Sequence, residues 1–104
     1  MKGQQKTFAD ALKERVDAKT LLRLDKAFTL ETESFEHLRN EVSEAVLTYM
    51  QENSIGPRKM AAMLCCSDPQ LIRITSGKHG LTLATIAHIG AAIGYKPRII
   101  FEEV

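Results

Sequence analysis

Few cysteines, no long apolar run and no excess of one charge sign limit what this 104-residue chain can be. Its two cysteines, Cys65 and Cys66, are adjacent, so a disulfide between them would be strongly strained, and no tetrahedral metal set surrounds them. We expect buried or half-buried thiols in a reducing compartment, with a redox sensor as the alternative. No apolar stretch approaches the roughly 18 residues of a membrane span. The sequence therefore predicts a cytoplasmic protein with no membrane partner.

Catalytic motifs are also missing. The chain has no glycine-rich phosphate loop, no metal-ligand spacing and no nucleophile at a recognisable separation from a base. We therefore expect neither an enzyme nor a bound metal or cofactor. With 44% apolar residues, the chain is long enough for one hydrophobic core and too short for two full domains.

Charge is distributed unevenly along the chain, although the net charge is only +1. The first 54 residues carry eight cations and ten anions. Between residues 55 and 98 one anion, Asp68, faces six cations: Arg58, Lys59, Arg73, Lys78, Lys96 and Arg98. This imbalance favours an anionic partner for the second half of the chain, against the alternative that these cations only solvate the fold.

Apolar spacing predicts two helices in the first half. Phe8, Leu12 and Val16 recur at helical intervals and indicate a helix over residues 7–23. The stretch TLETES, residues 29–34, loses that period and supplies capping residues, which predicts a break. A second helix should then run from about residue 35 to Asn53. Its apolar face comprises Phe35, Leu38, Val42, Ala45, Val46, Tyr49 and Met50.

Caps divide the second half into short helices. Pro57 suits the first turn of a helix that carries Met60, Ala61 and Leu64 on one edge. Ser67 is a candidate N-cap for the next helix, which Gly77 ends. Thr82 and Gly94 bound a further helix, whose expected buried face comprises Leu83, Ile86, Ile89, Gly90 and Ile93. The final KPRIIFEEV is typical of a β-strand.

Two short helices joined by a turn of about three residues are typical of a helix-turn-helix. On a helical wheel of the second short helix, Leu71 and Ile74 mark the inward direction. Asp68 lies at the margin. The outward set comprises Pro69, Ile72, Arg73 and Ser76.

The run from Gly56 to Ile93 resembles the Cro/C1-type (XRE) helix-turn-helix regulators. That family typically has a Leu-Ala helix, a Gly-x-Ser turn, a helix with Ile or Val inward, then Gly-Lys and a Ser/Thr-Leu-x-Thr-Leu helix. The matching positions here are Met60-Ala61, Leu64, Ser67, Leu71, Ile74, Gly77-Lys78, Thr82-Leu83-Ala84-Thr85-Ile86 and Ala92-Ile93-Gly94. Cys65 departs from the pattern, because it stands where the family has a glycine that favours left-handed backbone.

The resemblance implies an all-α, lambda-repressor-like bundle of about five helices. We divide the chain accordingly into an N-terminal helical extension (1–33), a helix-turn-helix DNA-binding domain (34–95) and a C-terminal dimerisation strand (96–104). Its implied function is sequence-specific regulation of transcription, as a repressor of bacterial or phage origin. Many small members are antitoxins, so a toxin protein is a further expected partner.

The resemblance also implies that the helix beginning at Asp68 enters the major groove of double-stranded operator DNA. There Arg73 could donate two hydrogen bonds to a guanine or contact only a phosphate. Ile72 and Pro69 could cover thymine methyl groups or form a protein-binding surface. Asp68 is interpreted mainly as a first-turn helix stabiliser, and alternatively as an acceptor for a cytosine amino group.

Further DNA contacts are expected around this helix. Gln70 could reach a base or a phosphate, and the capping Ser67 and outward Ser76 lie on the same candidate interface. Arg58 and Lys59 begin the preceding helix, where we expect phosphate contacts. Lys78 and His79 either contact the backbone beyond the helix or are simply solvated. His88, inside a helix, is interpreted as structural.

A second copy of the chain is the expected partner of the C-terminal strand. A lone strand cannot satisfy its own backbone groups, and no other segment has a clear strand pattern. We therefore predict that Arg98, Ile99, Ile100, Phe101 and Glu102 pair antiparallel with the same residues of a symmetry mate. A homodimer also suits a helix-turn-helix, because one copy contacts only a few base pairs. The alternative function is a protein-interaction module that keeps this fold without binding DNA.

Overall fold

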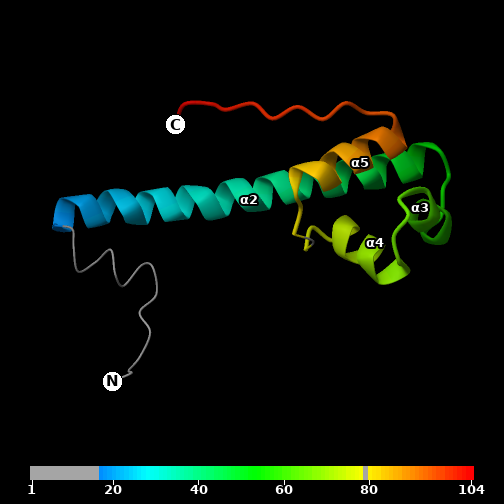
Figure 1. The fold of residues 1–104 in the computed structure, drawn as a ribbon, viewed down its shortest axis with the longest axis horizontal. Helices are drawn as coiled ribbons and strands as arrows, with labels where there is room; N and C mark the ends of the chain where they lie inside the picture. Colours follow the sequence, from blue (N-terminus) through cyan, green and yellow to red (C-terminus); the bar gives the residue numbers. More distant parts are fainter. Residues whose placement is uncertain (1–16, 79) are drawn as a thin grey trace, which may run out of the picture. The chain divides into compact units, whose positions relative to one another are not determined.

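The computed structural model describes residues 17–78 and 80–104, and this part of the chain is all-helical (Figure 1). Its helices are α2 (Ala18–Glu52), α3 (Pro57–Met63), α4 (Asp68–Thr75) and α5 (Leu83–Ile93). The expected all-α class is therefore confirmed. None of these helices combines the length and apolar character that crossing a bilayer requires. The chain divides after Ser34 into two units, and helices α3, α4 and α5 lie in the second.

Helix α2 contradicts the expected break at residues 29–34, because it continues through them without interruption. The Thr29 hydroxyl donates to the Asp25 carbonyl oxygen at 3.0 Å, and the Thr32 hydroxyl donates to that of Phe28 at 3.1 Å. These side chains, which favour caps elsewhere, here bond within the helix. The predicted end near residue 23 is wrong for the same reason, and the earlier part of that expected helix lies outside the described residues.

Asp17 marks where α2 starts. Its Oδ1 accepts a hydrogen bond from the Thr20 backbone N–H at 2.8 Å, which satisfies a free amide of the first turn. These hydrogen bonds, first from the Thr20 backbone and then from its side chain, lower the pKa of Asp17. The charged carboxylate is therefore the form that caps the helix.

The hydrophobic core of the second unit is built where α2, α3, α4 and α5 meet. All of its buried apolar members are positions that the apolar spacing had marked as inward. They are Val46, Met60, Ala61, Leu64, Leu71, Ile74, Ile89 and Ile93. Two predicted inward residues are exceptions: Leu83 in the first turn of α5 is 72% exposed, and Phe35 of α2 is 46% exposed.

Each of the four helices ends with a residue of left-handed φ, and hydrogen bonds from the two backbone amides there close the last turn. Glycine takes this place after α4 and α5, as predicted: Gly77 has φ +70° and Gly94 has φ +78°. After α2 and α3 the place is taken by Ser54 (φ +53°) and Cys65 (φ +54°). Two of the four turns therefore hold side chains that disfavour this conformation.

The C-terminal segment, residues 95–104, has no regular secondary structure in the single chain. The strand expected at 98–102 is therefore not formed here. A strand is defined by its hydrogen bonds to another strand, and no second strand occurs within the described residues. Its pairing with a second copy stays a prediction.

Candidate nucleic-acid interface

Helices α3 and α4 pack against each other across the four residues Leu64, Cys65, Cys66 and Ser67, against an expected turn of about three. The Cys65 N–H donates to the Ala62 carbonyl oxygen at 3.1 Å, and the Cys66 N–H donates to that of Ala61 at 3.0 Å. Cys65, with φ +54°, thus has the left-handed geometry that ordinarily favours glycine. Ala61, 2% exposed, provides the small side chain beside this turn.

The two thiols of the turn differ in environment. Cys66 is half-buried, as expected, whereas the expectation for Cys65 is wrong because that residue is exposed. The left-handed backbone at Cys65 reverses the chain at the end of α3, and its side chain stays outside the core. Burial raises the pKa of the Cys66 thiol, with smaller contributions from Asp68 and Cys65.

The start of α4 is held by a reciprocal capping box, which confirms Ser67 as the N-cap. Ser67 Oγ accepts from the Gln70 backbone N–H at 3.2 Å, and Gln70 Oε1 accepts from the Ser67 backbone N–H at 3.0 Å. Pro69 occupies the first turn, where its missing N–H costs nothing. The cap engages the carbonyl end of the Gln70 side chain and leaves its Nε2 amide group to donate elsewhere.

The end of α4 is tied to α2 by contacts that the sequence patterns did not predict. Buried Ser43 donates from Oγ to the Thr75 carbonyl oxygen at 2.5 Å. A Cβ on Gly77 would lie 2.6 Å from Asn40 Oδ1, the end of a flexible side chain that can move aside, so the φ of +70° is what favours glycine there. The one available signal was a small polar residue, Ser43, three positions before Val46 on the buried side of α2. Both ends of α4 are therefore fixed.

The outward face of α4 agrees with the helical wheel. Leu71 and Ile74 are 2% and 6% exposed, whereas Ile72 is 63% exposed. Pro69 and Arg73 are exposed beside Ile72, as are Asp68, Gln70 and Ser76. The Ser76 hydroxyl donates to the Arg73 carbonyl oxygen at 3.2 Å, so its proton is already used within the helix. Among the described residues, the side-chain groups of this face without a hydrogen-bond partner include the Arg73 guanidinium and the Gln70 Nε2 group, beside the apolar surfaces of Ile72 and Pro69.

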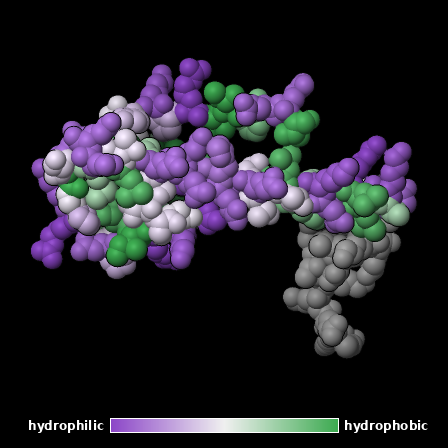
Figure 2. Space-filling model, turned by 180° about the vertical axis from the view of Figure 1, so that it is seen from behind, coloured by the Kyte–Doolittle hydropathy of each residue, from purple (hydrophilic) through white to green (hydrophobic). Residues whose placement is uncertain are grey.

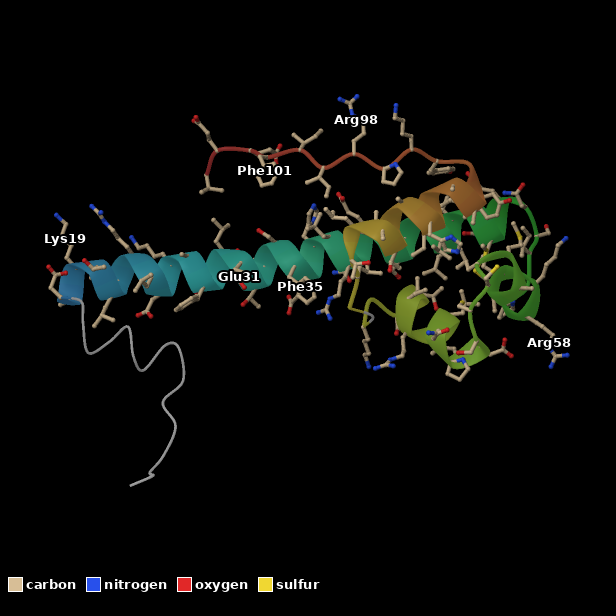
Figure 3. All side chains as sticks on the ribbon, in the orientation of Figure 1. Lys19, Glu31, Phe35, Arg58, Arg98 and Phe101 are labelled. Carbon is tan, nitrogen blue, oxygen red and sulfur yellow. The ribbon has the colours of Figure 1, made fainter. Side chains whose placement is uncertain are left out.

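Exposed cations precede and follow this helix in the chain. Arg58 and Lys59 lie in the first turn of α3, and Lys78 follows α4. The Arg58 side chain extends away from the helices (Figure 3). Within residues 17–78 and 80–104, no carboxylate lies within ion-pair distance of these three cations or of Arg73. His79 lies outside the described residues.

His88 joins α5 to the helix-turn-helix. Its Nε2 lies 2.9 Å from the carbonyl oxygen of Leu64, the residue that ends α3. Because a carbonyl oxygen can only accept, Nε2 carries the proton. This contact agrees with a structural role for His88.

Comparison with known proteins gives no relative: no protein-family model, curated protein or solved structure matches the chain. The chemistry of this surface is therefore the basis for a function.

Proposed function

We propose that this protein is a sequence-specific DNA-binding regulator, a repressor, that reads the major groove with α4 as a homodimer. One observation carries the proposal. A short helix fixed at both ends presents Ile72, 63% exposed, and an exposed Arg73, while Leu71 and Ile74 anchor its other face. A rigid exposed helix beside cations is what groove recognition requires.

Base recognition falls to the outward residues of α4. The Arg73 guanidinium donates to O6 and N7 of a guanine, a contact that discriminates against other bases by about 1 to 3 kcal/mol. Ile72 and Pro69 lie against thymine methyl groups, which gives their exposed apolar surfaces a partner. Gln70 donates from its free Nε2 group to a base or phosphate acceptor.

Phosphate contacts fix the position of α4 without adding sequence information. Arg58 and Lys59 supply them from α3, and Lys78 supplies them from the loop after α4. Each phosphate neutralised releases counterions, so binding should weaken steeply as salt rises. The homodimer, paired through residues 98–102, supplies the second α4 for a second half-site.

The experiment compares binding to the protein's own promoter fragment with binding to a scrambled fragment of equal length, at two salt concentrations. Arg73→Ala should remove most of the preference for the promoter. Lys59→Ala should weaken both complexes alike and reduce the salt slope by about one. Arg23→Ala, an exposed arginine outside the second unit, is the matched control and should change nothing. Equal affinity for both fragments would refute sequence-specific recognition.

A second candidate function is a protein-interaction module without DNA binding. The exposed Ile72 favours it, because a large apolar side chain on an outward helix suits a protein partner as well as a thymine. The four exposed cations of α3, α4 and the loop after α4 argue against it. Absence of binding to either DNA fragment at low salt would favour this second function, and a toxin would then be one such partner.

A further inference from the structure

An apolar groove lies in the second unit, away from the α3–α4 turn. It is a cavity of about 190 Å³ between α2, α5 and the segment that follows α5. Its apolar lining includes Leu38, Val42 and Ala45 of α2, Ile86, Ile89 and Ile93 of α5, and Pro97 and Ile99. Lys96 and Arg98 of the same segment lie at this groove. A cavity of about 150 Å³ with a similar lining can hold a benzene molecule, so this one has room for a phenyl ring.

Gly90 explains why the C-terminal segment lines the groove. The Tyr95 N–H donates to the Gly90 carbonyl oxygen at 2.8 Å, which turns the chain back over α5. A Cβ on Gly90 would lie 2.6 Å from Pro97 Cδ and 2.7 Å from the Tyr95 carbonyl oxygen. Only glycine permits this approach. The approach sets Pro97 and Ile99 at the edge of the groove.

Beyond the groove the segment is apolar and unpartnered. Ile99 is 45% exposed, Ile100 78% and Phe101 96%. Figure 2 shows hydrophobic atoms beside hydrophilic ones along this segment, at the top of that view. Among the described residues, no backbone hydrogen bond involves residues 96–104. Side chains and backbone are therefore both available to a second strand.

The side chains of the segment select one antiparallel register with a second copy. With the two Ile100 residues opposite each other, Arg98 of one copy faces Glu102 of the other. In the same register Ile99 faces Phe101 of the second copy. Opposite residues share a face, so a two-fold pair can change register only in steps that centre it on another residue. Centring the pair on Ile99 places Arg98 opposite Ile100, and centring it on Phe101 places Ile100 opposite Glu102. Charge and apolar pairing thus agree on a two-fold axis at Ile100.

We propose that in this register Phe101 of a second copy inserts into the groove of the first. Alternate side chains of a strand share a face, so Ile99 at the groove and the opposing Phe101 lie on the same face of the paired strands. The phenyl ring then covers Leu38 and Val42, and the symmetric contact forms in the other groove. This inference rests on the proposed homodimer and specifies what holds it together.

A tryptophan probe tests insertion directly, because the chain contains no tryptophan. In DNA-free protein, the emission of Phe101→Trp should shift to the blue as protein concentration rises through the dimer dissociation constant. Val104→Trp in the same segment is the control, and its emission should remain that of an exposed indole. Adding Leu38→Gln, which makes the groove polar, should abolish the shift. Leu47→Gln, on α2 but outside this groove, should not.

Charge reversal tests the register. In sedimentation equilibrium, Arg98→Glu or Glu102→Arg alone should raise the dimer dissociation constant about tenfold, because two ion pairs become repulsive. The double variant Arg98→Glu/Glu102→Arg should restore the original constant, since the pairs re-form with their signs exchanged. A structural defect in either single variant would not be repaired in this way.

The outcomes separate this inference from the proposed function. A dimer whose Phe101→Trp emission does not shift, or whose double variant stays weak, refutes groove insertion in this register while the homodimer stands. A monomer at every concentration refutes both the homodimer and the insertion. Recognition of DNA by α4 is decided separately, by the promoter comparison with Arg73→Ala.

Discussion

Replacing Cys65 with glycine should stabilise the protein. The residue has φ +54°, where a Cβ costs about 1 to 2 kcal/mol. Glycine removes this cost, but its greater backbone freedom stabilises the unfolded state by about 0.4 to 1 kcal/mol. The free energy of unfolding should therefore rise by about 0.5 to 1 kcal/mol. Because the Cys65 side chain is exposed, its removal sacrifices little buried apolar surface. For a domain of this size, the gain corresponds to a rise in Tm of a few degrees.

Urea denaturation followed by far-UV circular dichroism measures the difference. Cys65→Ala is the control, because it removes the thiol but keeps the Cβ and its strain, and its free energy of unfolding should stay close to that of the native chain. Ser54, with φ +53° after α2, is an independent second site at which glycine should act in the same direction. If the free energy of unfolding of Cys65→Gly does not exceed that of Cys65→Ala, the strain argument is refuted.

Three other predictions concern local contacts. Ser67→Ala removes the capping box and should lower the free energy of unfolding by about 1 kcal/mol in urea denaturation; no loss would mean that α4 does not depend on this cap. Gly90→Ala should displace the C-terminal segment from α5, visible as changed NMR shifts at Pro97, whereas unchanged shifts would show that the close approach is absent. Near neutral pH, iodoacetamide should alkylate Cys65 before Cys66, as followed by mass spectrometry, because burial raises the pKa of Cys66 and leaves less of its reactive thiolate. The difference between the two alkylation rates should narrow as pH rises. Faster alkylation of Cys66 than of Cys65 would contradict the half-buried position of Cys66.

Local signals made much of the helix-turn-helix predictable. Ser67 and Thr82 are N-caps because their hydroxyls accept from amides three residues later, a bond that needs only neighbouring chain. Gly77 and Gly94 end helices for an equally local reason, since their missing Cβ permits left-handed φ. The inward positions Leu71 and Ile74 follow from the helical period alone.

The same local signals gave wrong predictions at residues whose side chains are compatible with two backbone conformations. Thr29 and Thr32 are typical of breaks, yet within α2 their hydroxyls bond to carbonyl oxygens one turn earlier. Cys65 has a Cβ that disfavours left-handed backbone, but the residue adopts the glycine-like φ of +54°. In both places the alternatives differ by only about 1 kcal/mol, so the surrounding structure selects between them.

By itself the sequence determined the short helices of the second half, their caps, and the outward position of Ile72 and Arg73. Only the tertiary structure decided the contacts between distant segments: Ser43 with the end of α4, and Gly90 with Pro97. Such pairs carry no periodic signal, because their partners are neighbours only after the chain has folded. The groove beside Ile99 has the same origin, since its walls come from three separate parts of the chain.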